Sequence, residues 1–275
     1  MIEIVKSPSS KTFYRLIKES DSELLLCAPY ISKDVAREII HQKKIGTKLS
    51  VVTSLNIANF ISGSSDIEAI ELLLKNGANV INYHTLHAKI YLFDNKKALI
   101  TSANLTHFAL YRNYEYGVLI KEDETEAIEK IYDDFVAMLD SELRGEFTEF
   151  SINRIKNIKK SFKGNELIKF DSDEDGILPI DEKCKIKENL SPWERDIFEC
   201  LELINKTSFE LNDVYSFVPQ LKLKHPKNNN VEAKIRQMLQ NLRDLGFIKF
   251  VSPGHYKKLW VRVPLNFAQD NTVVA

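Results

Sequence analysis

Five side chains that could act together on a phosphodiester lie close to one another in the sequence: His87, Lys89, Ser102, Asn104 and Glu115. An ammonium and an amide can bind phosphate oxygens and stabilise the charge that grows on them during cleavage, and a hydroxyl can assist. An imidazole can attack phosphorus when a hydrogen bond to a group such as a carboxylate holds its reactive tautomer. The segment therefore predicts a phosphodiester-cleaving site with His87 as the nucleophile. Lys89 and Asn104 are the expected phosphate ligands, and Glu115 is the expected partner of the imidazole.

Two short apolar segments must hold these side chains together. Residues 88–93 and 98–102 are predicted strands, and the polar residues between them predict the turn of a β-hairpin. Because side chains two residues apart on a strand share a face, the hairpin can bring the His-x-Lys and Ser-x-Asn pairs to one sheet edge. Asp94 lies an odd number of residues from His87 and Lys89, which predicts a structural role in the turn.

The first 145 or so residues alternate between strand and helix patterns. Besides the hairpin, the predicted strands are 23–28, 48–54, 79–83 and 116–120, and the predicted helices are 33–43, 65–75 and 123–139. Elements of this size in this order predict an α/β domain in which helices sandwich a mixed β-sheet.

The segment H-x-K-x4-D at His87, Lys89 and Asp94, followed by Ser-x-Asn and a downstream acid, resembles the signature of the phospholipase D superfamily. The resemblance covers residues 1–145 and departs from the family at Thr101, where Gly is usual. It implies a phospholipase D-like fold, a phosphohistidine intermediate on His87, and a reaction that requires no metal or other cofactor.

The family site uses two such motifs, with one His as nucleophile and the other as general acid, and this sequence contains one. His225 has a Lys two residues later but no Ser-x-Asn element behind it, and His255 has Arg262 where the Asp is expected. The resemblance therefore implies that a second copy of the chain supplies the missing half. We expect a homodimer with the active site at the two-fold interface.

The second half of the sequence predicts a separate unit. Residues 146–190 are expected to form a linker with one helix at 151–162 and an acidic cluster at 171–176, either a solvated loop or a plug that competes with DNA. From 191 to 265 the predicted elements are a helix with a capping box at Ser191, a short helix at 211–217, an amphipathic helix at 230–245 and a hairpin at 247–263. This order is the plan of a winged helix-turn-helix, with a tail at 266–275.

Polar side chains on the long helix and on the wing formed by the hairpin are candidate DNA contacts, because such side chains can bind bases or phosphates of double-stranded DNA. They are Lys234, Arg236, Gln237, Gln240 and Asn241 on the helix, and His255, Lys257 and Lys258 on the wing. The alternative is an ordinary solvated helix in a domain that binds protein. The run H-P-K-N-N-N-V-E-A-K-I-R-Q resembles the winged-helix domain of the methyl-adenine-dependent restriction enzyme DpnI and its relatives, which implies sequence-specific DNA contact.

Composition limits the remaining classes. The net charge of −1 excludes a uniformly basic nucleic-acid binder, so any DNA contact must be local. The three cysteines have neither zinc nor disulfide spacing, and the sequence has no long apolar run and no signal-peptide pattern. We expect a cytoplasmic protein that makes no contact with membranes.

These observations predict a site-specific, metal-independent DNA endonuclease of the type II restriction kind. Two alternatives stay open. One is a DNA-binding regulator with a degenerate nuclease domain, and the other is a general phosphodiesterase or phospholipase.

Overall fold

The computed structural model describes most of the chain, namely residues 2–121, 123–141, 144–162, 177–180 and 185–263. Its packing divides the chain into two compact units, of which unit 1 comprises residues 1–55 and 63–149 and unit 2 comprises residues 56–62 and 150–275. The predicted acidic cluster and the predicted tail lie outside the described residues. No helix in the described ranges is long and apolar enough to cross a bilayer.

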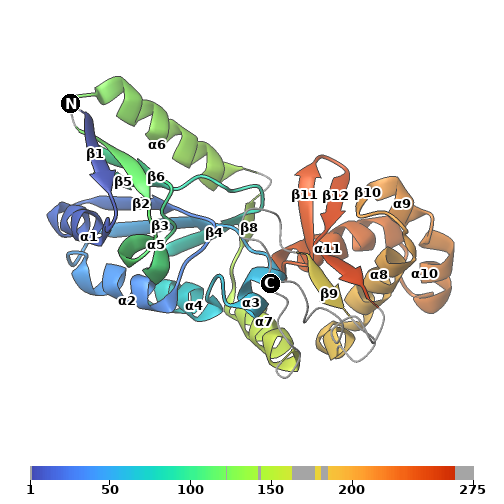
Figure 1. Ribbon diagram of the computed structural model, residues 1–275. Coiled ribbons are helices and arrows are strands. Elements are labelled where there is room, and N and C mark those ends of the chain that lie inside the picture. The colour runs from blue at the N-terminus through green and yellow to red at the C-terminus, as the bar shows by residue number, and fades with distance from the viewer. Residues whose placement is uncertain (1, 122, 142–143, 163–176, 181–184, 264–275) are drawn as a thin grey trace. The chain divides into compact units, whose positions relative to one another are not determined.

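Unit 1 is built on one eight-stranded sheet with the order β1-β7-β6-β5-β2-β3-β4-β8 (Figure 1). β2, β3 and β4 run parallel and the other neighbours are antiparallel, so the predicted mixed sheet is confirmed. The strands are Ile2–Lys6 (β1), Glu23–Cys27 (β2), Lys48–Thr53 (β3), Asn79–Tyr83 (β4), Ile90–Phe93 (β5), Lys97–Thr101 (β6), Tyr116–Ile120 (β7) and Arg144–Glu146 (β8).

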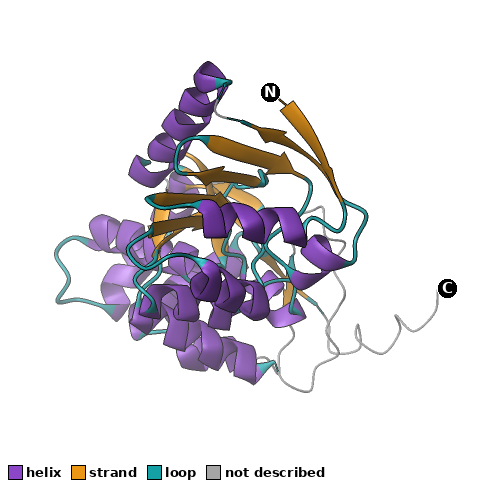
Figure 2. Ribbon diagram, turned by 90° about the vertical axis from the view of Figure 1, so that its left-hand side faces the viewer, coloured by secondary structure: helices purple, strands orange, loops and turns teal. Residues whose placement is uncertain are grey.

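Helices cover both faces of this sheet. α6 lies on one face, and α1, α2, α4 and α5 lie on the other (Figures 1 and 2). Their bounds are Ser10–Glu19 (α1), Lys33–Gln42 (α2), Ile67–Lys75 (α4), His107–Tyr111 (α5) and Thr125–Asp140 (α6).

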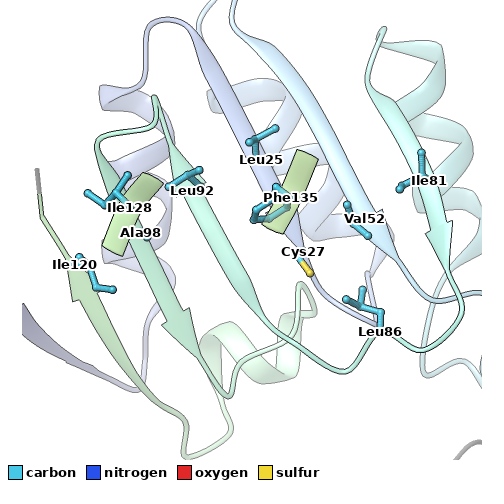
Figure 3. Packing of buried hydrophobic residues seen from close by; sticks show 10 residues of the cluster. All are labelled: Leu25, Cys27, Val52, Ile81, Leu86, Leu92, Ala98, Ile120, Ile128 and Phe135. Carbon is cyan, nitrogen blue, oxygen red and sulfur yellow. The ribbon is translucent and has the colours of Figure 1, made fainter. Parts of the chain in front are cut away.

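The core under α6 follows from the alternation of the strands. Leu25 and Cys27 of β2 face this helix, as do Leu92 of β5 and Ile120 of β7, while Phe135 of α6 packs down among them (Figure 3). Burying side chains of this size stabilises the unit by about 1.5–3 kcal/mol each. This packing between α6 and the sheet holds in place the central strands, whose ends carry the site.

The β5–β6 hairpin has the predicted turn. Asp94 and Asn95 adopt positive φ angles of 54° and 52°, which Asp and Asn tolerate better than most residues. The Asp94 carboxylate accepts hydrogen bonds from the N–H groups of Asp21 (2.8 Å), Ser22 (2.8 Å) and Glu23 (2.9 Å), and from the Ser22 hydroxyl (2.8 Å). Burial raises the pKa of this carboxyl, but these bonds outweigh burial and lower the pKa to about 2. Asp94 thus ties the hairpin turn to the start of β2.

His87 and Lys89 lie outside β5, although the sequence pattern placed them on that strand. β5 begins at Ile90, which pairs with Cys27, the last residue of β2. Since β2 ends at Cys27, residues 87–89 have no residue of β2 to pair with. The Lys89 carbonyl still accepts a hydrogen bond from the N–H of Thr101 on β6 (3.1 Å), so Lys89 remains next to the sheet edge.

Unit 2 has the elements of a winged helix-turn-helix. Its three-stranded sheet has the order β10-β12-β11, and a separate parallel pair joins β9 and β13. The elements are Ile57–Ser62 (α3), Glu149–Ser161 (α7), Leu178–Ile180 (β9), Lys185–Asn189 (a 3-10 helix), Pro192–Leu203 (α8), Ser208–Glu210 (β10), Leu211–Tyr215 (α9), Val218–Lys224 (α10), Val231–Asp244 (α11), Ile248–Ser252 (β11), His255–Lys258 (β12) and Trp260–Arg262 (β13).

The structure refines two expectations about unit 2. The predicted second wing strand is split at Leu259, because β12 pairs with β11 and β10 whereas β13 pairs with β9. Within residues 146–190, the described elements after β8 are α7, β9 and the 3-10 helix, and all three belong to unit 2 apart from the first residue of α7. The buried Glu194, which completes the capping box of α8, binds Arg154 of α7, so this helix is anchored to the winged-helix elements.

Candidate active site and nucleic-acid interface

One edge of the unit 1 sheet gathers the predicted site residues. Lys89 directly precedes β5, Ser102 directly follows β6, and Glu115 directly precedes β7. β5, β6 and β7 are antiparallel neighbours, so these three strand ends meet at the same edge. The edge is also the carboxyl end of the parallel strands β2, β3 and β4, where α/β sheets commonly bind ligands.

The acid of the motif holds the hydroxyl of the motif. Glu115 accepts a hydrogen bond from the Ser102 hydroxyl and another from the Asn113 amide (3.3 Å). Its N–H donates to the Ser7 hydroxyl (2.5 Å), and its carbonyl accepts from the Ser7 N–H (3.1 Å). The sequence pattern assigned Glu115 to His87, but within one chain its carboxylate bonds go to Ser102 and Asn113.

Thr101 shapes the Ser102–Asn104 loop. Its hydroxyl donates to the Tyr116 carbonyl (3.2 Å) and accepts from the Ala103 N–H (3.1 Å). The Ser102 hydroxyl in turn accepts from the Tyr116 N–H (3.1 Å). The residue that departs from the family pattern therefore ties the loop to β7.

His87 is exposed, and the Lys89 ammonium donates to the His87 carbonyl (2.9 Å). Below them lie two buried groups that do not supply a competing nucleophile. Burial raises the pKa of the Cys27 thiol to about 12, so the thiol stays protonated at neutral pH. The buried Tyr91 hydroxyl donates to the Ala103 carbonyl (2.6 Å) and supports the loop from beneath.

Asn104 has an amide oxygen that is buried and accepts no hydrogen bond from the described residues. A buried acceptor without a partner is uncommon in folded proteins and deserves a functional explanation. Such an oxygen can accept a bond from a ligand or from a second chain. This property distinguishes Asn104 from the neighbouring Ser102, whose bonds are made internally.

Two further histidines near the site have structural partners. His84 is buried against the amide of Asn82 (3.2 Å). His107 binds Asp34 (3.0 Å) and stacks on Tyr111 with a centroid distance of 4.6 Å. Among the described residues, no group of three or more His, Cys, Asp or Glu side chains is placed to hold a metal ion.

The long helix of unit 2 presents the predicted polar face. Its apolar positions, such as Ile235 and Leu242, are fully buried, while Arg236, Gln237 and Gln240 are exposed. Arg236 donates to the Tyr215 hydroxyl (2.5 Å), which fixes the direction of its guanidinium. The half-buried Lys234 donates to Gln237 (2.8 Å), so these two side chains are held together on the surface.

Two of the proposed DNA contacts point elsewhere. The Asn241 amide donates to the buried carboxylate of Glu194 (2.9 Å). Lys258 is only 8% exposed and caps the end of α8 by donating to the carbonyls of Leu201 (3.1 Å) and Ile204 (2.6 Å). Both side chains therefore stabilise the unit, because their polar atoms are already used inside it.

The wing retains two candidates. His255 is exposed, interacts with the Pro253 carbonyl (3.0 Å) and lies 3.7 Å from the Glu210 carboxylate. Lys257 is half-buried on the same strand. Together with Arg236, Gln237 and Gln240, they are the predicted contacts whose side chains stay at the surface of the unit.

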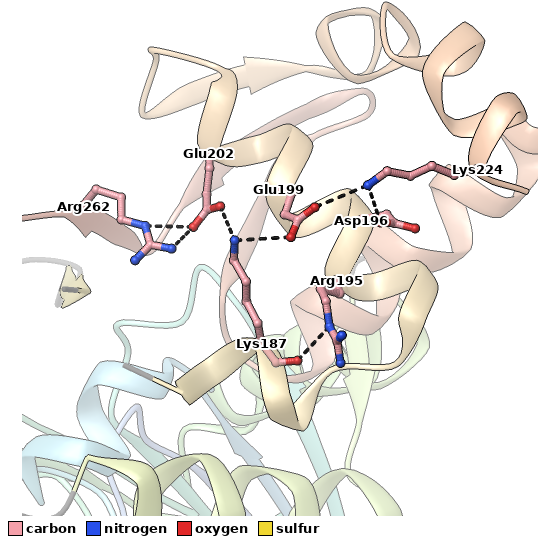
Figure 4. Close-up of polar contacts among 7 residues, drawn as sticks. All are labelled: Lys187, Arg195, Asp196, Glu199, Glu202, Lys224 and Arg262. Atoms are coloured by element: carbon pink, nitrogen blue, oxygen red, sulfur yellow. Dashed lines mark hydrogen bonds and ion pairs between the residues drawn. The ribbon is translucent and has the colours of Figure 1, made fainter. Parts of the chain in front are cut away.

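Cations along α8 are neutralised within the unit, as Figure 4 shows. Lys187 binds Glu199 and Glu202, and Lys224 binds Asp196 and Glu199. Arg262 also binds Glu202. Because these charges are paired with acids, α8 is a weaker candidate for phosphate contact than α11.

Some residues of the site were not found by sequence reasoning. Asn113 and Ser7 hold Glu115, and Gly117 lets β7 approach β6. Asn113 stands two residues before Glu115, and this short spacing could have indicated that the two side chains interact. No sequence signal connects Ser7 with a residue more than a hundred positions away.

The sequence matches two protein families. Residues 13–139 match the family described as the PLD-like domain of cardiolipin synthase, and residues 189–258 match the Dam-replacing HTH domain.

Several solved structures are similar to part of this chain. Nuc from Salmonella typhimurium, a phospholipase D family member, is 17% identical with a TM-score of 0.47, and the match covers 54% of this chain and 99% of that one. NucT from Helicobacter pylori is 21% identical with a TM-score of 0.45 and the same coverage. A phosphatidylserine synthase from Haemophilus influenzae is 14% identical with a TM-score of 0.45, over 58% of this chain and 45% of that one.

The family matches confirm both resemblances drawn from the motifs. The chain combines a phospholipase D-like α/β domain with a C-terminal winged-helix domain of the Dam-replacing type.

Proposed function

We propose that this protein is a DNA endonuclease in which the sheet-edge site of unit 1 cuts a phosphodiester and the winged helix selects where. One observation carries the proposal. The site residues Lys89, Ser102 and Glu115 end up at one sheet edge in a chain that also contains a winged-helix domain. The residues at the sheet edge are suited to cleaving a phosphodiester, and a winged-helix domain is suited to binding DNA, whose backbone consists of phosphodiesters.

In the first step the imidazole of His87 attacks phosphorus. A phosphorus–nitrogen bond forms, the bond to one strand oxygen breaks, and that oxygen leaves with a proton from a second imidazole. Lys89 and the Asn104 amide bind the equatorial oxygens, where negative charge accumulates in the transition state.

In the second step water attacks the phosphohistidine. The second imidazole, now neutral, takes a proton from the water while the phosphorus–nitrogen bond breaks and His87 is restored. The products are one phosphorylated and one hydroxyl end. We assign no step to a metal, because the ammonium, the amide and the two imidazoles supply the charge stabilisation and proton transfer that the reaction needs.

The second imidazole is proposed to be His87 of a second copy of the chain. The sequence offers a single His-x-Lys with the Ser-x-Asn element behind it. An apolar row crosses three strands, because the exposed Ile4 of β1 and Ile100 of β6 both pair with the half-buried Val118 of β7. Such a row is suited to burial in a two-fold contact between copies.

DNA selection is assigned to α11 and the wing. Gln237 and Gln240 are exposed on α11, and Gln can form bidentate bonds with adenine. Arg236 and Lys257 are suited to phosphate or guanine. This surface supports site-specific cleavage, so we propose a restriction-type enzyme.

The test is incubation of the purified full chain with a large mixed-sequence DNA in the presence of EDTA. Discrete fragments are the expected result. Binding without strand cleavage would instead indicate a DNA-binding regulator, and hydrolysis of phosphatidylcholine with intact DNA would indicate a phospholipase. Cleavage that stops completely on chelation would contradict the proposed mechanism.

A further inference from the structure

The exposed large hydrophobic side chains of unit 1 are concentrated on a few segments. Apart from Ile45, those in the described part of the unit lie on β1, on β6 or between residues 108 and 116. The last group is aromatic and consists of Phe108, Tyr111, Tyr114 and Tyr116. We call residues 108–116 the aromatic segment. It begins just after Asn104 and contains Glu115, so the stretch that presents these rings also carries site residues.

The rings are strongly exposed. Phe108 is 63% exposed and Tyr114 is 84% exposed, so neither contributes its full area to the folded core. Tyr111 is fixed by stacking on His107, with ring planes 20° apart. Exposed rings along one short stretch of the chain are available to a partner.

Two cations accompany the rings without acidic partners. The Arg112 guanidinium lies 5.7 Å from the centre of the Phe108 ring, and the Lys6 ammonium lies 5.5 Å from that of Tyr116. Within the described ranges, neither cation forms an ion pair with a carboxylate. Other cations of the unit do, as Arg15 does with a neighbouring acid.

The nearby acids are occupied by other groups. Asp34 binds His107 and the Ser32 hydroxyl, and Glu115 binds Ser102 and Asn113. Glu115 keeps its negative charge, but it is turned toward Ser102 and Asn113, so Arg112 and Lys6 are not paired with it. Rings interleaved with free cations are the combination that binds a nucleic-acid strand, since bases stack on rings and phosphates pair with cations.

We propose that the aromatic segment and Lys6 bind the DNA strand being cut, with bases stacked on Phe108 and Tyr114 and phosphates held by Arg112 and Lys6. This inference rests on the proposed function, because it places the strand next to the site of cleavage. A second copy of the chain is the other candidate occupant. The proposed two-fold contact uses the row of Ile4, Val118 and Ile100 instead, and the unpaired Arg112 and Lys6 suit a phosphate-bearing strand better than a second set of the same cations.

A consequence concerns the state of the DNA. A base can stack on a protein ring only after it leaves its stack in the duplex. A strand that is already unpaired next to the scissile phosphate is therefore bound and cut more readily than a fully paired strand.

The test measures binding and cleavage separately, with the full chain throughout. Binding of a fluorescent single-stranded oligonucleotide is measured by anisotropy with His87→Ala protein, and cleavage is measured on gapped and fully paired duplexes with His87 intact. Phe108→Ala and Tyr114→Ala should each weaken binding and raise KM on gapped DNA about tenfold, within the range known for base stacking, and leave kcat within a factor of about two. Arg112→Ala should also weaken binding and make it less salt-dependent.

Matched controls are Phe150→Ala and Arg15→Ala. Phe150 is 71% exposed with an arginine over its ring, but that arginine is committed to Glu194, and Arg15 is paired with Glu19. Both controls should bind and cut like the parent protein.

Unchanged oligonucleotide affinity in Phe108→Ala and Tyr114→Ala would overturn the inference. The inference would also be overturned if Phe108→Ala or Tyr114→Ala sedimented with half the mass of the parent protein, because the segment would then be a contact between copies. If the parent protein binds the oligonucleotide through these rings but cuts no DNA, the proposed function fails while the binding inference stands. If it cuts DNA and the rings do not matter, only the inference fails.

Discussion

Gly117 lies directly opposite Thr101 in the ladder between β6 and β7. A Cβ atom at residue 117 would come within 2.9 Å of the Thr101 Cβ and 2.8 Å of the Ile100 carbonyl oxygen, distances that real side chains do not tolerate. The absence of a side chain on β7 thus makes room for the threonine hydroxyl on β6, which ties the Ser102–Asn104 loop to β7. The departure from the family glycine at Thr101 is accommodated on the neighbouring strand.

The Thr101 hydroxyl should be needed for catalysis, and its loss should weaken the fold without unfolding it. Thr101→Val keeps the shape but removes two hydrogen bonds, each with a net contribution of about 0.5–1.5 kcal/mol, so kcat should fall about tenfold. Thr101→Ser, which keeps the hydroxyl, should retain most of the activity. Steady-state cleavage rates and thermal unfolding of both variants check this. Equal rates for Val and Ser would show that the hydroxyl does not position the loop.

Asp94 should stabilise unit 1 without affecting the chemistry. Its folded pKa of about 2 is below the ordinary value of 3.8, so its stabilising effect is complete above about pH 4 and is lost as pH falls toward 2. Asp94→Ala should lower the free energy of unfolding at pH 7 by about 1 kcal/mol, less than the pKa shift alone implies because solvent screens this partly exposed carboxylate. Urea unfolding at pH 7 and at low pH measures this. Asp21→Asn, which alters an exposed carboxylate paired with Lys44, is the control and should change stability little. If the free energy of unfolding of Asp94→Ala differed from that of the parent by the same amount at pH 7 and at pH 2, the carboxylate would be ruled out as the cause.

Arg154 should hold α7 to the winged-helix elements. Its side chain is 14% exposed and binds both oxygens of Glu194, which is 2% exposed. Burial raises the pKa of Glu194, but the bonds from Arg154 and Ser191 lower it to about 2. Arg154→Ala leaves this charge buried and should destabilise unit 2 by about 3–5 kcal/mol. Lys206→Ala removes an exposed pair with Asp213 and should cost less than about 1 kcal/mol. Denaturant unfolding compares the two, and equal losses would contradict the anchoring role.

Mixing experiments should reveal a site shared between two copies. If each site needs His87 from both chains, an equal co-refolded mixture with His87→Ala protein should retain roughly a quarter of the parent activity, the share of dimers with two intact copies. A site within one chain would retain half. The control is a mixture of the parent with His41→Ala protein, which alters an exposed histidine of α2. This mixture should keep the full activity of the parent.

Sequence reasoning found the parts of the fold that have strong local patterns. The buried run Glu23–Cys27, the helix after Asn230 and the capping box at Ser191 all carry such patterns, and all appear in the structure. β1 and β8 were missed because they are short strands at the edges of the sheet, and the partners that define them, β7 and β4, are distant in sequence.

The site was predictable to the extent that its chemistry is local. The motif spacing pointed to the edge where Lys89, Ser102 and Glu115 meet. It did not show that Gly117 faces Thr101, because register between strands depends on the whole sheet. Asn241 and Lys258 were assigned to DNA because they are polar, whereas the fold turns them toward the carboxylate and carbonyl groups inside unit 2.

The covalent role of His87 is the central claim, and trapping tests it most directly. The protein is mixed with internally 32P-labelled DNA, quenched in alkaline detergent and digested. The proposal predicts label on the peptide that contains His87, stable in alkali and lost in acid, and no label or cleavage with His87→Ala. His41→Ala should label like the parent. DNA cleavage by His87→Ala at the parent rate, or cleavage by the parent with no labelled protein at any time, would contradict the claim.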